Sequence, residues 1–255
     1  MTATDLGGRT PFIDTYRAVY AGQLARAKAA RAPLLIVASI QSVGLIVLLR
    51  GIVSGGPGAE QQQLVAGATV LVVAFVALNL LAQRVGYLKA SGALDYYAAL
   101  PVPPAAVVLA MAAAYASFAV PGTLVTALVG VLLYDLSFAH FWVVAPAVAL
   151  AGAALAGLGA ALGLALPRPE LATVSGQLGM TLVLFLGMVR GARMPDALRL
   201  VRAAVPSSYA ADALAIALGP DPDLGAVARQ LAGCAVLAVA ALALATAAWR
   251  RGLHR

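Results

Sequence analysis

Apolar residues run through this chain in six long stretches, separated by shorter segments that hold the charged residues. A helix needs about 20 apolar residues to cross the hydrocarbon layer of a membrane, which is about 30 Å thick. The charged side chains lie at the ends of these stretches or outside them. The pattern therefore predicts six membrane-spanning helices, at Pro33–Val53, Gln63–Gln83, Ala105–Leu133, Val143–Leu166, Leu171–Val189 and Gln230–Ala248.

The segment before the first stretch has a different pattern. Its apolar residues recur at helical spacing while Asp14, Arg17, Arg26 and Lys28 fall elsewhere on the helical wheel. The apolar set is Phe12, Ile13, Tyr16, Val19, Tyr20 and Leu24. We expect an amphipathic helix in the membrane interface, and the polar Gln23 on its apolar face indicates that this face meets protein as well as lipid. A plain membrane anchor is the alternative interpretation.

Composition agrees with an all-α integral membrane protein, since 62% of the residues are hydrophobic, 11% are charged and mean hydropathy is +0.93. Residues 1–32 are predicted to be a cytoplasmic N-terminal segment without a cleavable signal peptide, residues 33–249 a six-span transmembrane domain, and residues 250–255 a basic cytoplasmic tail. Most Lys and Arg residues then fall on the cytoplasmic side, as the positive-inside rule requires. The excess of Arg over Lys, with abundant Ala, indicates a bacterial inner-membrane protein.

The chain lacks the groups that several function classes need. No carboxylate, His or Lys lies along the spans to carry an ion path, and no phosphate-binding loop, zinc-protease motif or nucleophile turn occurs. Cys234 is alone and the two histidines lie in opposite flanks, so no metal site or disulfide is predicted. The basic residues are scattered, which argues against nucleic-acid binding. We expect no catalytic residue and no cofactor in this chain, and any energy for transport must come from another subunit.

A few uncharged polar groups occur inside the spans, namely Gln41, Asn79, Gln177 and Thr181. Such groups can line a path for a substrate or form hydrogen bonds between neighbouring helices, and the second role is the commoner one. The fourth span contains Gly159 and Gly163 in a G-x-x-x-G pattern, which favours close helix packing within or between chains.

The loop between the second and third spans, residues 84–104, is predicted to form a short cytoplasmic helix. Gly92 is placed to begin it, Asp95 lies near its positive end, and Pro101 stops it before the third span. Leu94, Tyr97 and Pro101 are expected to present apolar surface to a cytoplasmic partner. In the alternative interpretation, Tyr96 and Tyr97 simply lie among lipid headgroups.

The longest outer segment, residues 190–229, contains a semi-apolar stretch at 201–218 that Arg202, Pro206 and Asp212 interrupt. A seventh span there would place the basic C-terminus outside, so we expect a hairpin that enters the membrane partway from the outer face. The arginines of this segment, Arg190, Arg193, Arg199 and Arg202, are either solvated surface charge or contacts for an anionic headgroup or an external partner.

Two local patterns give this chain a family resemblance. Gly92, Leu94, Asp95 and Pro101 match a G-x-L-[DE] pattern followed by a proline turn, and Pro206, Tyr209, Asp212 and Leu214 match P-x-x-Y-x-x-[DE]-x-[LI] before the last span. With the six-span plan and the N-terminal helix, the chain resembles the permease subunit of a type-2 ABC exporter. It departs from the family in having Leu100 where Thr or Ser is frequent and in its basic outer segment.

The resemblance implies roles for these residues. Gly92, Leu94, Asp95, Tyr96, Tyr97, Leu100 and Pro101 would form the coupling helix that docks on an ATPase, and Pro206, Tyr209, Asp212 and Leu214 would belong to an outer re-entrant gate. The transporter would contain two copies of a separate ATPase, which binds ATP and magnesium, and a second permease chain, as a homodimer or a related heterodimer. It would export a hydrophobic or amphipathic substrate by alternating access.

Three other function classes remain open from the residues alone. A non-transporting scaffold or assembly factor with the same fold is the leading alternative. A membrane enzyme would have to use Tyr209 and Asp212 near the outer face. A passive channel lacks support because the spans hold no ring of charge or filter-like loop.

Overall fold

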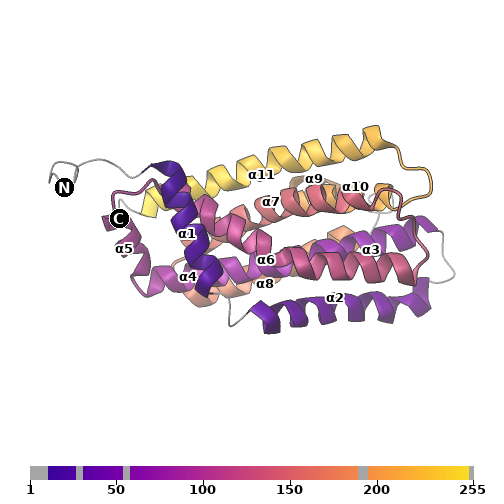
Figure 1. The fold of residues 1–255 in the computed structure, drawn as a ribbon, viewed down its shortest axis with the longest axis horizontal. Helices are drawn as coiled ribbons and strands as arrows, with labels where there is room; N and C mark the ends of the chain where they lie inside the picture. The colour runs from indigo at the N-terminus through magenta and orange to yellow at the C-terminus, as the bar shows by residue number, and fades with distance from the viewer. Residues whose placement is uncertain (1–10, 27–30, 54–57, 189–194, 253–255) are drawn as a thin grey trace.

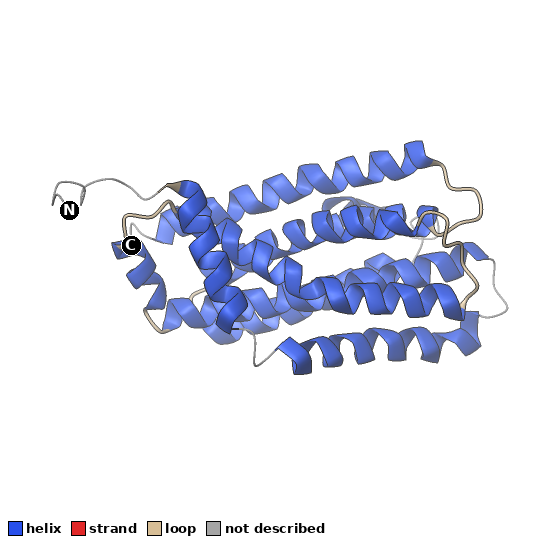
Figure 2. Ribbon diagram, in the orientation of Figure 1, coloured by secondary structure: helices blue, strands red, loops and turns tan. Residues whose placement is uncertain are grey.

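The structure, a computed structural model, describes residues 11–26, 31–53, 58–188 and 195–252. These residues form helices and connecting loops, and no strand occurs among them (Figure 2). The α-helices are α1 (Phe12–Arg26), α2 (Arg31–Val53), α3 (Gly58–Val73), α4 (Leu81–Ala90), α5 (Ala93–Ala99), α6 (Pro104–Leu133), α7 (Val144–Ala165), α8 (Pro169–Met188), α9 (Asp196–Ala204), α10 (Pro206–Ala217) and α11 (Leu224–Gly252). A π-helix, η1 (Ala74–Leu80), joins α3 to α4, and a 3-10 turn, η2 (Phe141–Val143), precedes α7.

Five helical segments of the described chain are long and apolar enough to cross a membrane: Gly58–Ala90, Pro104–Leu133, Phe141–Ala165, Pro169–Met188 and Leu224–Arg251. They correspond to the second through sixth predicted spans, and each begins one to six residues before its predicted start. The first predicted span coincides with α2, a helix of 23 residues whose described apolar part is Ile40–Arg50. The count of six spans therefore stays a prediction.

The long helices lie side by side, with α5 at one end of the bundle and the α6–α7 and α10–α11 connections at the other (Figure 1). Helix α1 and the end of α11 lie near the α5 end, and α1 runs across the long helices (Figure 1). The two described chain ends thus lie at the same end of the bundle. The cytoplasmic placement of both tails stays a prediction.

Helix α7 lies in the middle of the bundle and packs against α4, α6, α10 and α11. Its glycines allow this close packing: a Cβ added at Gly159 would lie 2.5 Å from the Leu78 carbonyl oxygen, and one at Gly163 would lie 2.7 Å from that of Ala82. On its other side, Gly157 meets the α11 backbone at Ala241. The G-x-x-x-G pattern is therefore used for packing within the chain.

Prolines mark helix ends more often than helix bends in this fold. Pro146 is the third residue of α7 and does not interrupt it, because an N–H group at that position has no partner within the helix. Pro121 lies inside α6, which nevertheless continues as one helix of 30 residues. Pro206 begins α10, and the extended Val205 before it separates α9 from α10.

The N-terminal helix α1 contacts the bundle through α6. Thr15 and Gln23 are each 5% exposed, the Tyr20 hydroxyl lies 3.0 Å from that of Ser117, and Ile13 is 60% exposed. Gln23 thus lies on the face that contacts protein, as its place on the predicted apolar face indicated. The exposed Ile13 leaves part of the helix available to lipid.

Candidate functional site

Helix α5 begins and ends where the sequence predicts. Gly92 precedes it with φ of 70°, a left-handed conformation that glycine adopts without steric strain. Leu100 follows it in an extended conformation, which the residue before a proline favours. The helix is thereby held between α4 and α6, each of which belongs to a span candidate.

The orientation of α5 differs from the expected one. Leu94 and Tyr97 are only partly exposed and pack against the core of the bundle, whereas Tyr96 is 67% exposed. Leu100 is 37% exposed and Pro101 is exposed. The side chain of Asp95 lies outside the described residues. The surface available to a partner is therefore formed by Tyr96, Leu100 and Pro101, and the prediction that Leu94 and Tyr97 project outward is wrong.

A groove of about 420 Å³ lies between α1 on one side and α5 with the segment that follows it on the other. Thr15, Val19 and Gln23 line it from α1, and Tyr97 and Leu100 line it from the other side. The N-terminal helix and the α5 region thus form one continuous surface at this end of the bundle.

Lys89 joins the end of α4 to the end of α7. Its Nζ donates to the carbonyl oxygens of Leu164 and Leu166 at 2.7 and 3.0 Å. These carbonyls lie at the C-terminal end of α7, where they lack partners within the helix and the dipole favours a cation. The contact links α4, the helix that precedes α5, to α7 in the middle of the bundle.

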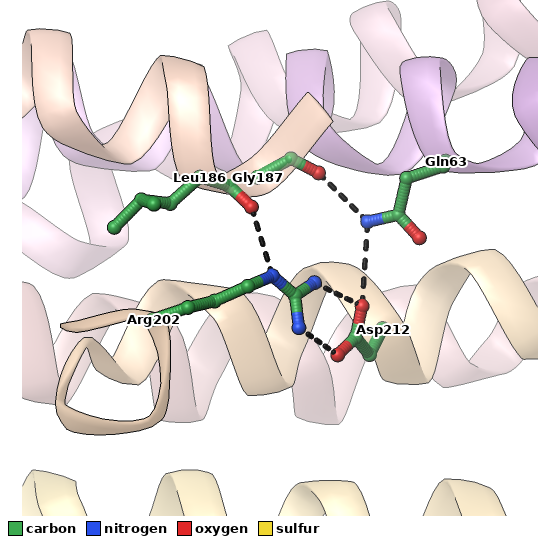
Figure 3. Close-up of polar contacts among 5 residues, drawn as sticks. All are labelled: Gln63, Leu186, Gly187, Arg202 and Asp212. Atoms are coloured by element: carbon green, nitrogen blue, oxygen red, sulfur yellow. Dashed lines mark hydrogen bonds and ion pairs between the residues drawn. The ribbon is translucent and has the colours of Figure 1, made fainter. Parts of the chain in front are cut away.

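At the opposite end, Asp212 of α10 is the centre of a polar network (Figure 3). Arg202 of α9 binds its carboxylate with two hydrogen bonds of 2.5 and 2.7 Å, and Arg202 Nε donates to the Leu186 carbonyl oxygen at 3.1 Å. Gln63 of α3 donates to the Gly187 carbonyl oxygen at 2.7 Å and to Asp212 at 3.3 Å. The network therefore connects α3, the end of α8, α9 and α10.

The predicted gate residues all lie on α10, which packs against α3, α7, α8 and α11. Pro206 and Leu214 are buried. The Tyr209 hydroxyl donates to the Ala203 carbonyl oxygen at 3.0 Å, and its ring lies so close to Gly233 of α11 that a Cβ there would be 2.8 Å away. Because Tyr209 and Asp212 both have structural partners, the arrangement gives no support to the membrane-enzyme alternative.

Three of the four polar residues predicted inside the spans come together near η1. Asn79 Nδ2 donates to Gln177 Oε1 at 3.3 Å, Gln83 donates to Asn79 Oδ1 at 2.9 Å, and Thr181 donates to the Gln177 carbonyl oxygen at 3.0 Å. Asn79 is buried while Gln177 is exposed on α8. Gln41, the fourth, is exposed on α2.

Several residues of these sites escape prediction from the sequence. In the sequence, Gln63 is only the first residue of a predicted span, and Arg202 is only a charge that interrupts a semi-apolar stretch, so neither is predicted to join the Asp212 network. Lys89 lies in the predicted loop and is counted only as a cytoplasmic charge. Within the described ranges, no group of three or more His, Cys, Asp or Glu residues is arranged to hold a metal ion.

A comparison with protein families decides which kind of protein has this arrangement. The sequence model of the ABC-2 type transporter matches residues 17–218, which is most of the chain. The chain belongs to the ABC-2 type transporter family. The match runs from α1 to the end of α10 and so contains both the α5 region and the Asp212 network. No curated protein matches the sequence.

Membership in the ABC-2 family explains why the chain has long apolar helices. This is a multi-pass membrane protein whose family supplies the transport domain of ABC transporters and associates with ATPase subunits. The family resemblance inferred from Gly92–Pro101 and Pro206–Leu214 is thereby confirmed.

Proposed function

We propose that this chain is the permease subunit of an ATP-driven exporter in a bacterial inner membrane. Two copies of a separate ATPase bind ATP and magnesium and drive it, and a second permease chain, identical or related, completes the path. The tails and α5 face the cytoplasm, and the α9–α10 region faces outward. The observation that carries the proposal is the family match over residues 17–218 combined with the exposed Tyr96 on a short helix between two long ones.

The contacts of α5 support a coupling role. Force applied at Tyr96 reaches α4 and α6 directly through the chain, because α5 is joined to both by short segments. It reaches α7 through the Lys89 contacts with Leu164 and Leu166. Since α7 packs against α10 and α11, movement at the cytoplasmic end is transmitted to the outer end.

The Asp212 network supports a closed outer end. For α9 and α10 to move together away from α3 and α8, the hydrogen bonds of Gln63 to Asp212 and of Arg202 to Leu186 must break. The Arg202–Asp212 ion pair lies within the α9–α10 unit and can move with it. We propose that α9 and α10 form the re-entrant pair that closes the exit.

The polar residues of α8 indicate a path for an amphipathic substrate. Gln177 is exposed, and the same helix exposes Leu178 and Phe185, each 65% exposed. In a dimer, such a face supplies both apolar surface and hydrogen-bonding groups. We propose that Gln177, Thr181, Asn79 and Gln41 contribute to the path.

Co-purification with the ATPase tests the coupling role. Tyr96→Ala removes an exposed aromatic side chain from α5, and we expect it to lower recovery of the complex and ATP-driven transport about ten-fold, as truncation of a central interface residue does. Trp142→Ala is the matched control, because Trp142 is 60% exposed at the opposite end of the bundle. Equal effects of the two substitutions would contradict the assignment of α5.

A further inference from the structure

A pocket of about 210 Å³ lies beside the Asp212 network, between α9, α10 and the start of α11. Its polar and charged lining comes from Arg199, Arg202, Ser208, Tyr209, Asp212 and Gln230. It lies away from the α5 surface and from the polar residues near η1. Neither the coupling role nor the proposed path uses it.

The charges of the pocket leave one guanidinium available. Arg202 and Asp212 neutralise each other through two hydrogen bonds and have side-chain exposures of only 12% and 22%. Among the described residues, the Arg199 guanidinium pairs with the carboxylate of Asp196 three residues before it, and these side chains are 56% and 88% exposed. An exposed pair of this kind contributes little and exchanges readily with solvent. Arg199 can therefore turn to an anion in the pocket.

A buried hydroxyl provides the second observation. Ser208 is only 2% exposed, lines the pocket, and its Oγ atom has no hydrogen-bond partner in the described structure. An unsatisfied buried hydroxyl is unfavourable, so an acceptor oxygen from a ligand would stabilise it. Ser208 also lies in the first turn of α10, a helix of 12 residues, where the dipole favours negative charge.

We propose that this pocket binds the phosphate group of an anionic lipid headgroup or a free phosphate ion. The Arg199 guanidinium and the Ser208 hydroxyl donate to phosphate oxygens, with the Gln230 amide as a third donor. Tyr209 is a wall rather than a donor, because its hydroxyl already donates to Ala203. An occupied pocket would hold α9 and α10 against α11, so a bound phosphate would stabilise the outer end in its present arrangement.

Native mass spectrometry of the purified chain tests this proposal. We would titrate dioleoyl phosphatidylglycerol, dioleoyl phosphatidylcholine and inorganic phosphate separately. We expect wild-type chain to prefer phosphatidylglycerol to phosphatidylcholine, or to bind inorganic phosphate, and Arg199→Gln and Ser208→Ala each to weaken that binding about five-fold or more. Displacement of phosphatidylglycerol by inorganic phosphate identifies a free-ion site, and its persistence identifies a lipid site.

Two controls make the result specific. Arg229→Gln removes an arginine of α11 that is 75% exposed and pairs with Asp223 at 3.8 Å outside the pocket lining, and it should leave binding unchanged. Ser208→Ala removes an unpaired hydroxyl, so the unliganded variant should melt at or above the wild-type temperature. Equal losses from Arg199→Gln and Arg229→Gln, or no binding of either phosphate source, would overturn the proposal. Because no ATPase is present, the outcome is independent of the exporter assignment.

Discussion

The Asp212 network gives the sharpest test of the structure. Asp212→Asn keeps the shape of the side chain but leaves the Arg202 guanidinium without its counter-charge. Breaking a buried ion pair by removing one partner costs about 3–5 kcal/mol. The Arg202 and Asp212 side chains retain 12% and 22% exposure, so solvent reduces this loss, and we expect about 2–3 kcal/mol.

Thermal unfolding of the purified chain in detergent measures this loss. For a chain of this size, the expected decrease in free energy of unfolding corresponds to a Tm lower by about 5–10 °C. Asp196→Asn is the matched control, since it removes the carboxylate of the exposed Arg199–Asp196 pair and should change stability by less than about 0.5 kcal/mol.

A double-mutant cycle separates the ion pair from the rest of the network. Arg202→Gln and Asp212→Asn should each destabilise the chain, and the double variant should be more stable than the sum of the single losses predicts, by about 1.5 kcal/mol or more. Two results would refute the inference that the Arg202–Asp212 pair holds α9 against α10. One is strictly additive losses in the cycle, and the other is an Asp212→Asn variant with the same Tm as Asp196→Asn.

Three further substitutions test the packing of the bundle. Gly159→Ala should lower the free energy of unfolding by about 1–3 kcal/mol, because the added Cβ meets the backbone of η1. Gly44→Ala is the control, since no atom beyond the adjoining helix backbone lies within 4 Å of the added Cβ, and it should leave the free energy of unfolding unchanged. Thermal unfolding compares the two variants. Lys89→Met should speed amide hydrogen exchange in the last turn of α7, because the variant loses the Lys89 hydrogen bonds to the carbonyl oxygens there. Unchanged exchange would show that Lys89 does not stabilise the end of α7. Tyr134→Phe should lower the free energy of unfolding by about 1 kcal/mol, because its hydroxyl donates to the Ile46 carbonyl oxygen, whereas the exposed Tyr87→Phe should be neutral by the same measurement.

The protonation state of the Tyr134 hydroxyl agrees with its role as the hydrogen-bond donor to Ile46. Burial raises the pKa of its hydroxyl above the ordinary value of 10.0, while Arg50 lowers it by a smaller amount. The hydroxyl therefore stays protonated through the neutral range. Its hydrogen bond to Ile46 connects α2 with the end of α6, and it should be lost only as pH rises through this raised pKa.

Hydropathy predicts the long helices of this chain well because each is a continuous apolar segment, and five of them are long enough to cross a membrane. The predicted Val143–Leu166 and the observed α7 differ by one residue at each end. The start of α5 is also predictable, since Gly92 has the left-handed conformation that its residue type permits. These features depend on local sequence alone.

The features that escape prediction depend on contacts between distant residues. Gln63 and Asp212 are 149 positions apart, and nothing local to either shows that they meet. The π-helix η1 lies where Gly159 and Gly176 bring two other helices against its backbone. A helix of seven residues such as α5 has too few turns for a periodic pattern, so its sequence does not fix which tyrosine faces outward.

Transport by the reconstituted complex tests the central claim most directly. The chain would be placed in proteoliposomes with and without its ATPase, and flux of an amphipathic fluorescent probe would be followed on addition of ATP and magnesium. The account predicts uphill, ATP-dependent flux only when both proteins are present, and loss of that flux with Tyr96→Ala. Uphill flux by this chain alone, or ATP hydrolysis without any flux in the complete complex, would contradict it.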